Sequence, residues 1–304
     1  MAYVIRYNVK SRKQGNYYLD WYTSFIESGF KPIGITGVLQ MGRNKECVLV
    51  HEAVDFGKIS SWRSAARNLL SWCWYSIIFF LLIRKETRMI ILSKNDYKDL
   101  DRKALFAKSF SNHLLITHTK ASVKKFEHLG LNVKWLPFGW SQHAIKGINK
   151  DRKHIDVGFR GNANAKWLHS DREKTFQLFN EFNDVISTDI KISQNGEHFL
   201  YGHDYYEWLS KCKFQLNSES AEGTISPRIF EQMALRVCPL AISGDYEGLL
   251  KRYVNYIPIN EENILDTLEE MKNEALVNSI IDNNEKFVVK YEISNMISEC
   301  FEKP

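Results

Sequence analysis

Apolar residues in the first half of the chain follow two spacings. Short continuous apolar runs, typical of buried strands, alternate with longer stretches in which apolar residues recur every three to four positions, as in an amphipathic helix. The pattern predicts strands over Tyr3–Tyr7, Cys47–Val50, Met89–Ser93, Leu114–Thr117 and Val133–Leu136. It predicts helices over Asn16–Ser28, Ser60–Ile83 and Lys120–Leu129.

A polar and basic segment, Gln142–Lys153, interrupts this pattern, which then starts again. Strands are predicted at Ile155–Phe159, Asp189–Ile192, Phe214–Asn217, Cys238–Ile242 and Tyr256–Ile259, and helices at Ser170–Phe182, Tyr205–Cys212, Pro227–Ala234 and in the charged C-terminal region. Alternation of strand and helix in both halves predicts an α/β protein with mainly parallel sheets. We expect a first domain over residues 1–145, a second over 154–285, and a C-terminal helix over 286–304.

The stretch Asn68–Ile83 is nearly all apolar and lies between basic residues. It falls a little short of the roughly 20 residues that cross a membrane. Three interpretations remain open: a buried core helix, a helix lying in a membrane interface, and a membrane span. The basic flanks and the Trp and Phe residues favour contact with a membrane surface through residues 63–88 under the second interpretation.

Charge and cysteine content narrow the class of partner. The 304 residues carry a net charge of +5, from 41 basic and 36 acidic side chains. This mild excess suits an anionic small molecule or a membrane surface and gives no support for nucleic acid as a partner. The five cysteines form no CxxC pair, which favours reduced thiols in the cytoplasm. The N-terminus lacks the apolar core of a signal peptide. We therefore expect a cytoplasmic protein, with the inner face of the membrane as a place of association.

Parallel α/β sheets bind ligands beyond the carboxyl ends of their strands. The segments that follow predicted strands are Asn8–Gly15, His51–Asp55, Lys94–Asp96, Phe138–Ser141, Arg160–Lys166, Ser218–Ser226 and Ser243–Asp245. Two domains that turned these segments toward each other would form one cleft.

The segment Asn217–Ile242 carries the densest chemical signal. Ser226 can cap the predicted helix, with Pro227 at its first position, so free backbone N–H groups are available to a phosphate. Arg228 lies in the first turn and can hold a diphosphate with two parallel hydrogen bonds. Glu231, one turn later, can accept hydrogen bonds from ribose hydroxyls. The alternative is a capped helix with a surface Arg–Glu pair, although Ser226 and Glu231 are too far apart for a capping box.

The run Tyr205–Ile242 resembles the donor-site signature of bacterial glycosyltransferases with the GT-B fold, in particular the CgeB-like and group-1 families. Ile155–Asn162 resembles the strand that opens the donor domain in those proteins, and Val133–Gly139 resembles the close of the acceptor domain. The resemblance implies two Rossmann-like domains facing across a cleft, with C-terminal helices crossing back to the N-terminal domain.

The same resemblance implies roles for individual residues. Arg228 would contact the donor pyrophosphate and Glu231 the nucleotide ribose. Gly161 lies in the loop that approaches the donor phosphates, and Ser226 caps the phosphate-facing helix. Without a bound metal, the basic side chains of Arg160, Lys166 and Arg228 would stabilise the leaving diphosphate.

Catalytic groups are less well marked. An inverting transferase needs a base on the acceptor side, for which Asp96 and Glu52 follow N-terminal strands; both can equally be loop caps. Glu222 is the candidate for the second glutamate of the retaining group-1 enzymes, although its spacing from Glu231 differs from theirs. Arg236 stands where these families usually have glycine. Retention or inversion is left open.

We therefore expect a glycosyltransferase that moves a sugar from a nucleoside diphosphate sugar to a glycan or lipid-linked acceptor in cell-surface polysaccharide synthesis. Two alternatives remain. The first is a sugar epimerase or phosphorylase of the same fold. The second is a non-enzymatic protein that docks on membranes.

Overall fold

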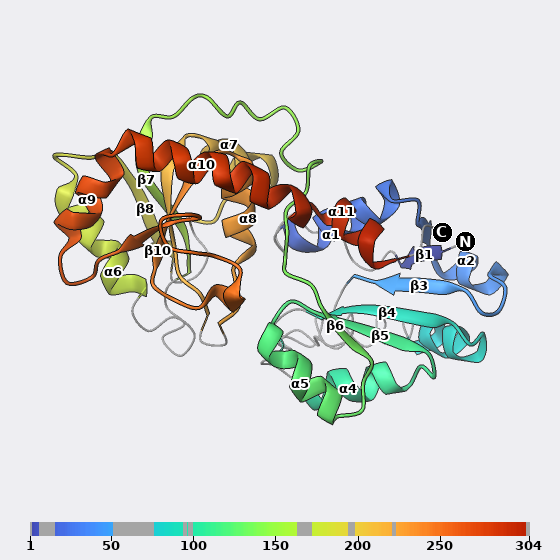
Figure 1. The fold of residues 1–304 in the computed structure, drawn as a ribbon. Coiled ribbons are helices and arrows are strands. Elements are labelled where there is room, and N and C mark those ends of the chain that lie inside the picture. Colours follow the sequence, from blue (N-terminus) through green and yellow to red (C-terminus); the bar gives the residue numbers. More distant parts are fainter. Residues whose placement is uncertain are drawn as a thin grey trace, which may run out of the picture. The chain divides into compact units, whose positions relative to one another are not determined.

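The chain folds into two compact units, each described here by itself (Figure 1). The computed structural model describes residues 2–5, 16–50, 76–93, 96, 100–162, 172–193, 198–220 and 223–301. The first unit comprises Met1–Ser11, Trp21–Leu136 and Cys300–Pro304, and the second comprises Arg12–Asp20 and Pro137–Glu299. The expected C-terminal segment, 286–304, is thus divided between the units, and the second unit also takes a short N-terminal segment.

The first unit contains a parallel sheet with strand order β2-β1-β3-β4-β5-β6. Its strands are β1 (Ala2–Ile5), β2 (Lys31–Ile33), β3 (Glu46–Leu49), β4 (Arg88–Ser93), β5 (His113–Thr117) and β6 (Val133–Trp135). Its helices include α1 (Asn16–Glu27, shared with the second unit), α2 (Ile35–Gln40), residues 76–84, α4 (Leu100–Lys108) and α5 (Lys120–His128). The short β2 and α2, and the more polar α4, have no counterpart in the sequence prediction.

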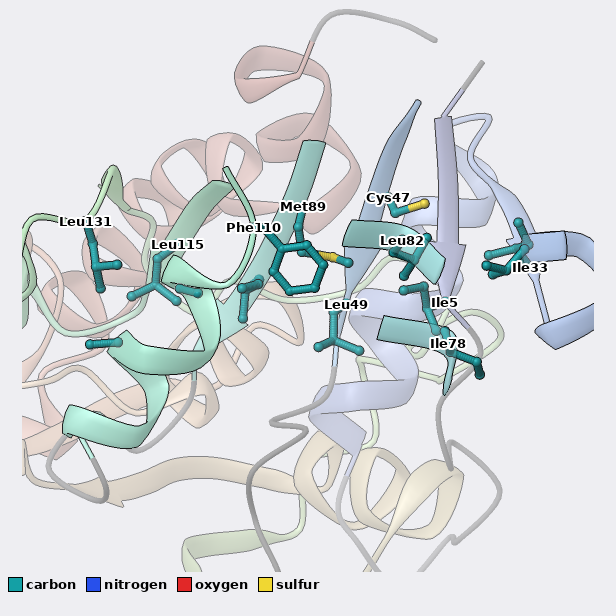
Figure 2. Close-up of a cluster of buried hydrophobic side chains, with 14 of the residues drawn as sticks. Ile5, Ile33, Cys47, Leu49, Ile78, Leu82, Met89, Phe110, Leu115 and Leu131 are labelled. Carbon is teal, nitrogen blue, oxygen red and sulfur yellow. The ribbon is translucent and has the colours of Figure 1, made fainter. Parts of the chain in front are cut away.

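Alternate residues of these strands form the core on one face of the sheet (Figure 2). Leu49, Ile91 and Leu115 belong to neighbouring strands and pack in this cluster with Leu82, from the helix at residues 76–84, and with Phe110, which follows α4. Because side chains point to opposite faces along a strand, the intervening residues, such as Ile90 and Leu92, are buried on the other face. The central strands of the sheet are therefore buried on both faces, as in parallel sheets generally.

The helix at residues 76–84 is the described part of the apolar stretch. Ile78 and Leu82 are buried in the core, whereas Ile77 and Phe80 are 50% and 55% exposed. Residues 51–75, including the rest of the stretch, lie outside the described residues. In the described ranges, every helix is too short or too polar to cross a bilayer.

The second unit contains a parallel sheet with strand order β11-β10-β9-β7-β8. Its strands are β7 (Ile155–Asn162), β8 (Thr188–Ser193), β9 (Cys212–Asn217), β10 (Cys238–Ile242) and β11 (Ile257–Ile259). The helices are α6 (Arg172–Leu178), α7 (Gly202–Ser210), α8 (Pro227–Ala234), α9 (Ile264–Lys272), α10 (Glu274–Val288) and α11 (Ile293–Cys300), with short 3₁₀ turns at Phe179–Phe182, Tyr246–Gly248 and Val289–Tyr291. The expected α/β class with parallel sheets is confirmed in both units.

Helices cover both faces of this second sheet. On one face, Phe159 packs with Phe176 of α6, and Leu268 of α9 and Ile280 of α10 belong to the same cluster. On the other face, Trp208 of α7 lies against Gly158, where an added Cβ would be 3.1 Å from the indole ring. In sheets covered by helices on both faces, ligands bind beyond the carboxyl ends of the strands.

Candidate nucleotide site at the carboxyl edge of the second sheet

The strand order reverses between β7 and β9. From β7 the chain moves outward to β8, then returns across β7 to form β9 and continues in the other direction to β10 and β11. Such a reversal is where doubly wound sheets bind their ligands, beyond the carboxyl ends of the strands. Gly161 lies at this end of β7 and Asn217 at this end of β9. The segment predicted to bind a nucleotide follows directly from Asn217.

Helix α8 begins at this edge as its sequence predicts. The Ser226 hydroxyl accepts a hydrogen bond from the backbone N–H of Arg228 at 3.4 Å, and Pro227 occupies the first turn. The predicted cap is confirmed. The cap leaves other N–H groups of the first turn at the positive end of the helix dipole. This arrangement suits a bound phosphate.

The guanidinium of Arg228 lies against Gly161. A Cβ built at Gly161 would be 2.5 Å from Nη1 and 2.7 Å from Nη2 of Arg228, so the approach requires glycine at this position. The Cζ atom of Arg228 also lies 5.4 Å from the ring centroid of Phe159, a cation–π distance. The structure thus brings together two predicted residues that are far apart in the sequence.

Glu231 lies one turn further along α8 and is 8% exposed. Its Oε1 accepts a hydrogen bond from the Tyr206 hydroxyl at 3.2 Å. The same hydroxyl lies 3.0 Å from Oδ2 of Asp20, which belongs to the same compact unit. Burial and the nearby Glu231 charge raise the pKa of Asp20 to about 8, and hydrogen bonding with the Tyr206 hydroxyl opposes the rise. Asp20 therefore keeps its proton to a higher pH than an ordinary aspartate does.

Sequence reasoning did not identify Tyr206 or Asp20 as part of this site. Tyr206 lies within a predicted helix, but nothing in the sequence distinguishes it from Tyr205 beside it. Asp20 is 186 positions from Tyr206 in the chain. Only the folded arrangement shows that a buried hydroxyl connects a carboxyl group of α1 to Glu231.

The Arg160 side chain forms its contacts on the opposite face of the sheet from Gly161. Because successive side chains of a strand point to opposite faces, Arg160 faces α7, where its Nη2 pairs with Asp189 Oδ2 at 2.5 Å. The Trp208 indole N–H donates to the same oxygen at 2.8 Å, and Arg160 lies over the Trp208 ring. Burial alone would raise the pKa of Asp189, but the hydrogen bonds from Arg160 and Trp208 lower it below its usual value.

Two of the loops at this edge are connected by a side chain that the sequence analysis did not single out. Glu219, which follows β9, accepts backbone hydrogen bonds from Asp245 at 3.3 Å and Tyr246 at 2.8 Å, both of which follow β10. Its carboxyl group lies where a Cβ of Gly244 would be. Glu219 therefore fixes the loop after β10 against the loop that leads to α8.

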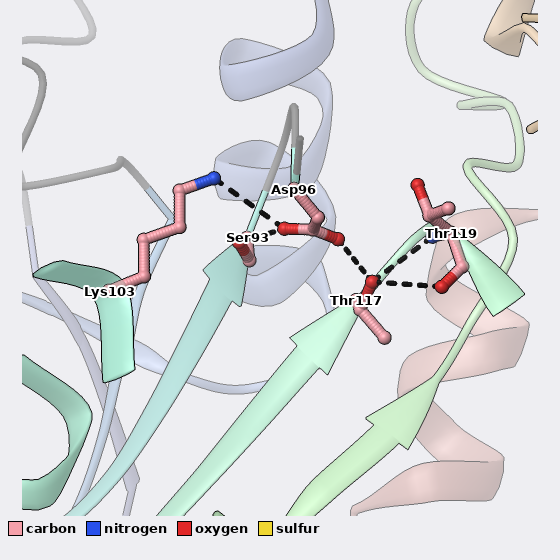
Figure 3. Close-up of polar contacts among 5 residues, drawn as sticks. All are labelled: Ser93, Asp96, Lys103, Thr117 and Thr119. Atoms are coloured by element: carbon pink, nitrogen blue, oxygen red, sulfur yellow. Dashed lines mark hydrogen bonds and ion pairs between the residues drawn. The ribbon is translucent and has the colours of Figure 1, made fainter. Parts of the chain in front are cut away.

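In the first unit, Asp96 follows β4 and lies in a buried polar network (Figure 3). Ser93 donates to its Oδ1, Thr117 donates to its Oδ2, and Lys103 Nζ lies 3.5 Å from Oδ1. Burial raises the pKa of Asp96, while Lys103 and the two hydroxyls oppose the rise. The Asp96 side chain is 1% exposed. This arrangement joins the carboxyl ends of β4 and β5 and fits the loop-stabilising alternative better than a base open to an acceptor.

The remaining predicted residues, Glu52, Lys166 and Glu222, lie outside the described residues, and their roles stay predictions. Among the residues that the structure describes, no group of three or more His, Cys, Asp or Glu side chains is arranged to hold a metal ion.

Comparison with known proteins rests on structure. No known family model matches the sequence, and no curated protein matches it. HepE from Anabaena, solved with UDP and glucose, superposes with a TM-score of 0.55 at 10% identity over 98% of both chains. A glycosyltransferase from Rickettsia africae gives 0.51 at 9% identity, over 98% of this chain and 96% of that one.

Two further solved structures superpose with similar scores. A putative UDP-N-acetylglucosamine 2-epimerase from Listeria monocytogenes gives a TM-score of 0.52 at 11% identity, over 99% of this chain and 98% of that one. The GtfA/B complex gives 0.50 at 11% identity over 86% of this chain, which spans only 56% of that chain.

The chain has the GT-B fold. The superpositions run over nearly the whole length of HepE and the epimerase, so both sheets take part in the match. At identities near 10%, the shared property is the fold. The candidate site at α8 belongs to the second of the two GT-B sheets.

Proposed function

We propose that this chain transfers a sugar from a nucleoside diphosphate sugar to a glycan or lipid-linked acceptor. The observation that carries the proposal is the contact of Arg228 with Gly161 at the reversal of strand order, with Glu231 one helical turn away. A diphosphate placed at the start of α8 would meet the helix N-terminus and a planar guanidinium together. Its nucleoside would then extend along α8 toward Glu231.

These groups supply the chemistry that sugar transfer needs from the donor side. As the bond from the anomeric carbon to the diphosphate breaks, negative charge grows on the leaving oxygen. Arg228 and the free N–H groups of α8 would stabilise that charge, because they are fixed before the reaction by Gly161 and the Ser226 cap. Glu231, held by Tyr206, would accept hydrogen bonds from the ribose hydroxyls. Lys166, Glu222 and Glu52 remain candidates for further contacts, and no metal is required in this scheme.

The likeness to structures solved with a nucleotide supports this choice. The HepE structure contains UDP and glucose, and a second protein with the same fold is described as a glycosyltransferase. The lack of CxxC pairs among the five cysteines supports a cytoplasmic site of action, and the net charge of +5 supports association with an anionic membrane face. Cell-surface polysaccharide synthesis is the pathway class that such a location and acceptor favour.

A thermal-shift screen of the purified protein against UDP, GDP, CMP, ADP and dTDP tests the proposal. A nucleotide at 100 times its dissociation constant stabilises the folded state by about 2.7 kcal/mol, which raises the melting temperature measurably. Arg228→Ala should abolish the response. Arg102→Ala, which removes an exposed arginine of α4, should keep it. No response to any nucleotide, or an equal response in Arg228→Ala, would contradict the proposal.

An epimerase with the same donor site is the second candidate, because the putative Listeria epimerase shares the fold over nearly its whole length. The two activities differ in what they need besides the donor. A transferase releases the nucleoside diphosphate in proportion to a new glycosidic bond, whereas an epimerase inverts a carbon of the sugar without a separate acceptor. NMR of the sugar products, with and without added glycan acceptor, distinguishes them.

A further inference from the structure

The second unit has a pocket at the amino edge of its sheet, the edge opposite Gly161. Its volume is about 710 Å³, within the range of small-molecule sites. Phe214 and Lys213 at the start of β9 and Asp156 at the start of β7 form part of its wall. Arg236, in the turn that leads from α8 to β10, forms another part. None of these residues belongs to the candidate nucleotide site.

One side of the pocket is apolar. The apolar residues that line it come from α9, α10, β9 and the turn before β8, namely Val185, Ile186, Phe214, Leu268, Met271, Val277 and Ile281. Phe214 and Leu268 are buried, and they connect the floor of the pocket to the core cluster of the unit. This surface can take a hydrocarbon or ring system of a ligand.

The other side is rich in cations. Five basic residues line the pocket, Lys150, Lys153, Lys213, Arg236 and Lys272, against the acidic Asp151, Asp156 and Glu274. Some of this charge is already balanced, because Lys213 pairs with Asp156 at 2.7 Å and Lys272 pairs with Glu269 at 2.7 Å. Lys153 differs from Lys213: its Nζ donates to the backbone carbonyl of Leu235 at 3.1 Å. Burial lowers the pKa of Lys153 to about 8; Arg236 and Lys150 add to this effect, whereas Cys212 and Asp151 oppose it. Arg236 and Lys150 therefore repel the Lys153 ammonium, and a bound anion would relieve that repulsion.

The backbone conformation of Arg236 supports a role for this side chain in binding an anion. Its φ angle is +57°, in the left-handed region that favours glycine. Arg236 is the first residue after Leu235, the C-cap residue of α8. Glycine is common at this position after a helix. The guanidinium lies 3.3 Å from Glu285, but both side chains are exposed, and such pairs contribute little to stability. A side chain kept at an unfavourable backbone position beside a pocket is consistent with a role in binding.

We propose that this pocket binds a soluble single-chain amphiphile with an anionic headgroup, with the apolar body on α9 and α10 and the headgroup beside Lys153 and Arg236. The charge complementarity selects the anionic head, and the apolar wall selects the body. The site is independent of the proposed transferase activity, because it uses the other edge of the sheet.

Isothermal titration of the full chain with monomeric dodecyl phosphate, below its micellar concentration, tests this proposal. The expected result is binding at least tenfold tighter than that of dodecyl maltoside, which lacks the charge, or of inorganic phosphate, which lacks the chain. Arg236→Gly should weaken binding of dodecyl phosphate about tenfold. Glycine is the residue best suited to the left-handed backbone, so this variant should fold with an unchanged or raised melting temperature.

A second variant tests the apolar wall. Val277→Asp places a negative charge on the α10 side of the pocket and should abolish binding while leaving the nucleotide response unchanged. Equal affinity for the neutral and anionic amphiphiles, or unchanged affinity in Arg236→Gly, would overturn the proposal. Binding to vesicles that contain phosphatidic acid without binding of monomeric dodecyl phosphate would also overturn it, since it would indicate a membrane surface site.

Discussion

Arg228 lies so close to Gly161 that a single methyl group at position 161 would be 2.5 Å from its Nη1 atom. The contact joins the first turn of α8 to the end of β7, and it is possible only because residue 161 has no side chain. The atoms that would be displaced are the flexible end of the arginine, whereas the backbone around them can stay in place.

Gly161→Ala should therefore reduce nucleotide affinity about tenfold or more with little change in melting temperature. The methyl group would push the guanidinium away from the diphosphate position. Nucleotide titration and thermal unfolding measure the two effects separately. Gly158→Ala is the matched control on the same strand, because its Cβ would be 2.4 Å from the buried Cys212 sulfur and 3.1 Å from Trp208. That variant should lose stability by about 1–3 kcal/mol through overpacking. Unchanged nucleotide affinity in Gly161→Ala would show that the Arg228 guanidinium does not contact the nucleotide.

Glu231→Gln should weaken binding of a ribonucleotide more than binding of its 2′-deoxy form. The change removes the charge that strengthens hydrogen bonds from the ribose hydroxyls, and keeps an oxygen able to accept from Tyr206. Loss of a hydrogen bond to a charged group costs about 1.5–3 kcal/mol, or roughly 10- to 100-fold in affinity. Calorimetric titration of wild type and variant with UDP and 2′-deoxy-UDP gives the interaction free energy between Glu231 and the ribose 2′-hydroxyl. An equal loss for both ligands would mean that Glu231 does not contact the ribose 2′-hydroxyl.

The buried carboxyl of Asp20 should make stability depend on pH. Its pKa rises from 3.8 to about 8 in the folded protein, so between these values the unfolded chain has released a proton that the folded chain retains. Stability from this group is fully present below about pH 4 and is lost as the pH rises to about 8. Asp20→Asn, which resembles the protonated form, should flatten this part of the pH profile and raise stability at pH 8 relative to wild type. Urea unfolding at pH 5 and pH 8 measures the difference, and parallel profiles for the two proteins would refute the assignment.

Asp96→Ala should destabilise the first unit by about 3 kcal/mol, because it removes the carboxylate facing the buried Lys103 ammonium. Asp96→Asn combined with Lys103→Met should recover much of that loss, since it removes both charges. Denaturant unfolding of wild type, the single variant and the double variant measures the free energy of unfolding of each. Loss of sugar transfer with an unchanged unfolding profile in Asp96→Ala would instead identify Asp96 as the base.

The sequence by itself determined the elements whose signals are local. Helix α8 begins at Pro227 and ends at Ala234 as predicted, because a serine cap and a first-turn proline fix its start without help from distant residues. The continuous apolar runs of β4 and β5 likewise predicted buried parallel strands. The more polar α4 was missed because its burial comes from packing against the sheet, which periodicity alone did not reveal.

Tertiary structure decided which of the predicted groups meet. Gly161 and Arg228 come together because β7 and β9 are neighbours in the sheet, whereas Arg160, one residue earlier, points to the other face and pairs with Asp189. Asp20 and Tyr206 meet although they are 186 positions apart in the sequence, and burial then raises the pKa of Asp20. Strand order, strand face and burial are properties of the whole fold. The residue types and their local spacing could therefore nominate Arg228 and Glu231, but could not show which partners would hold them in place.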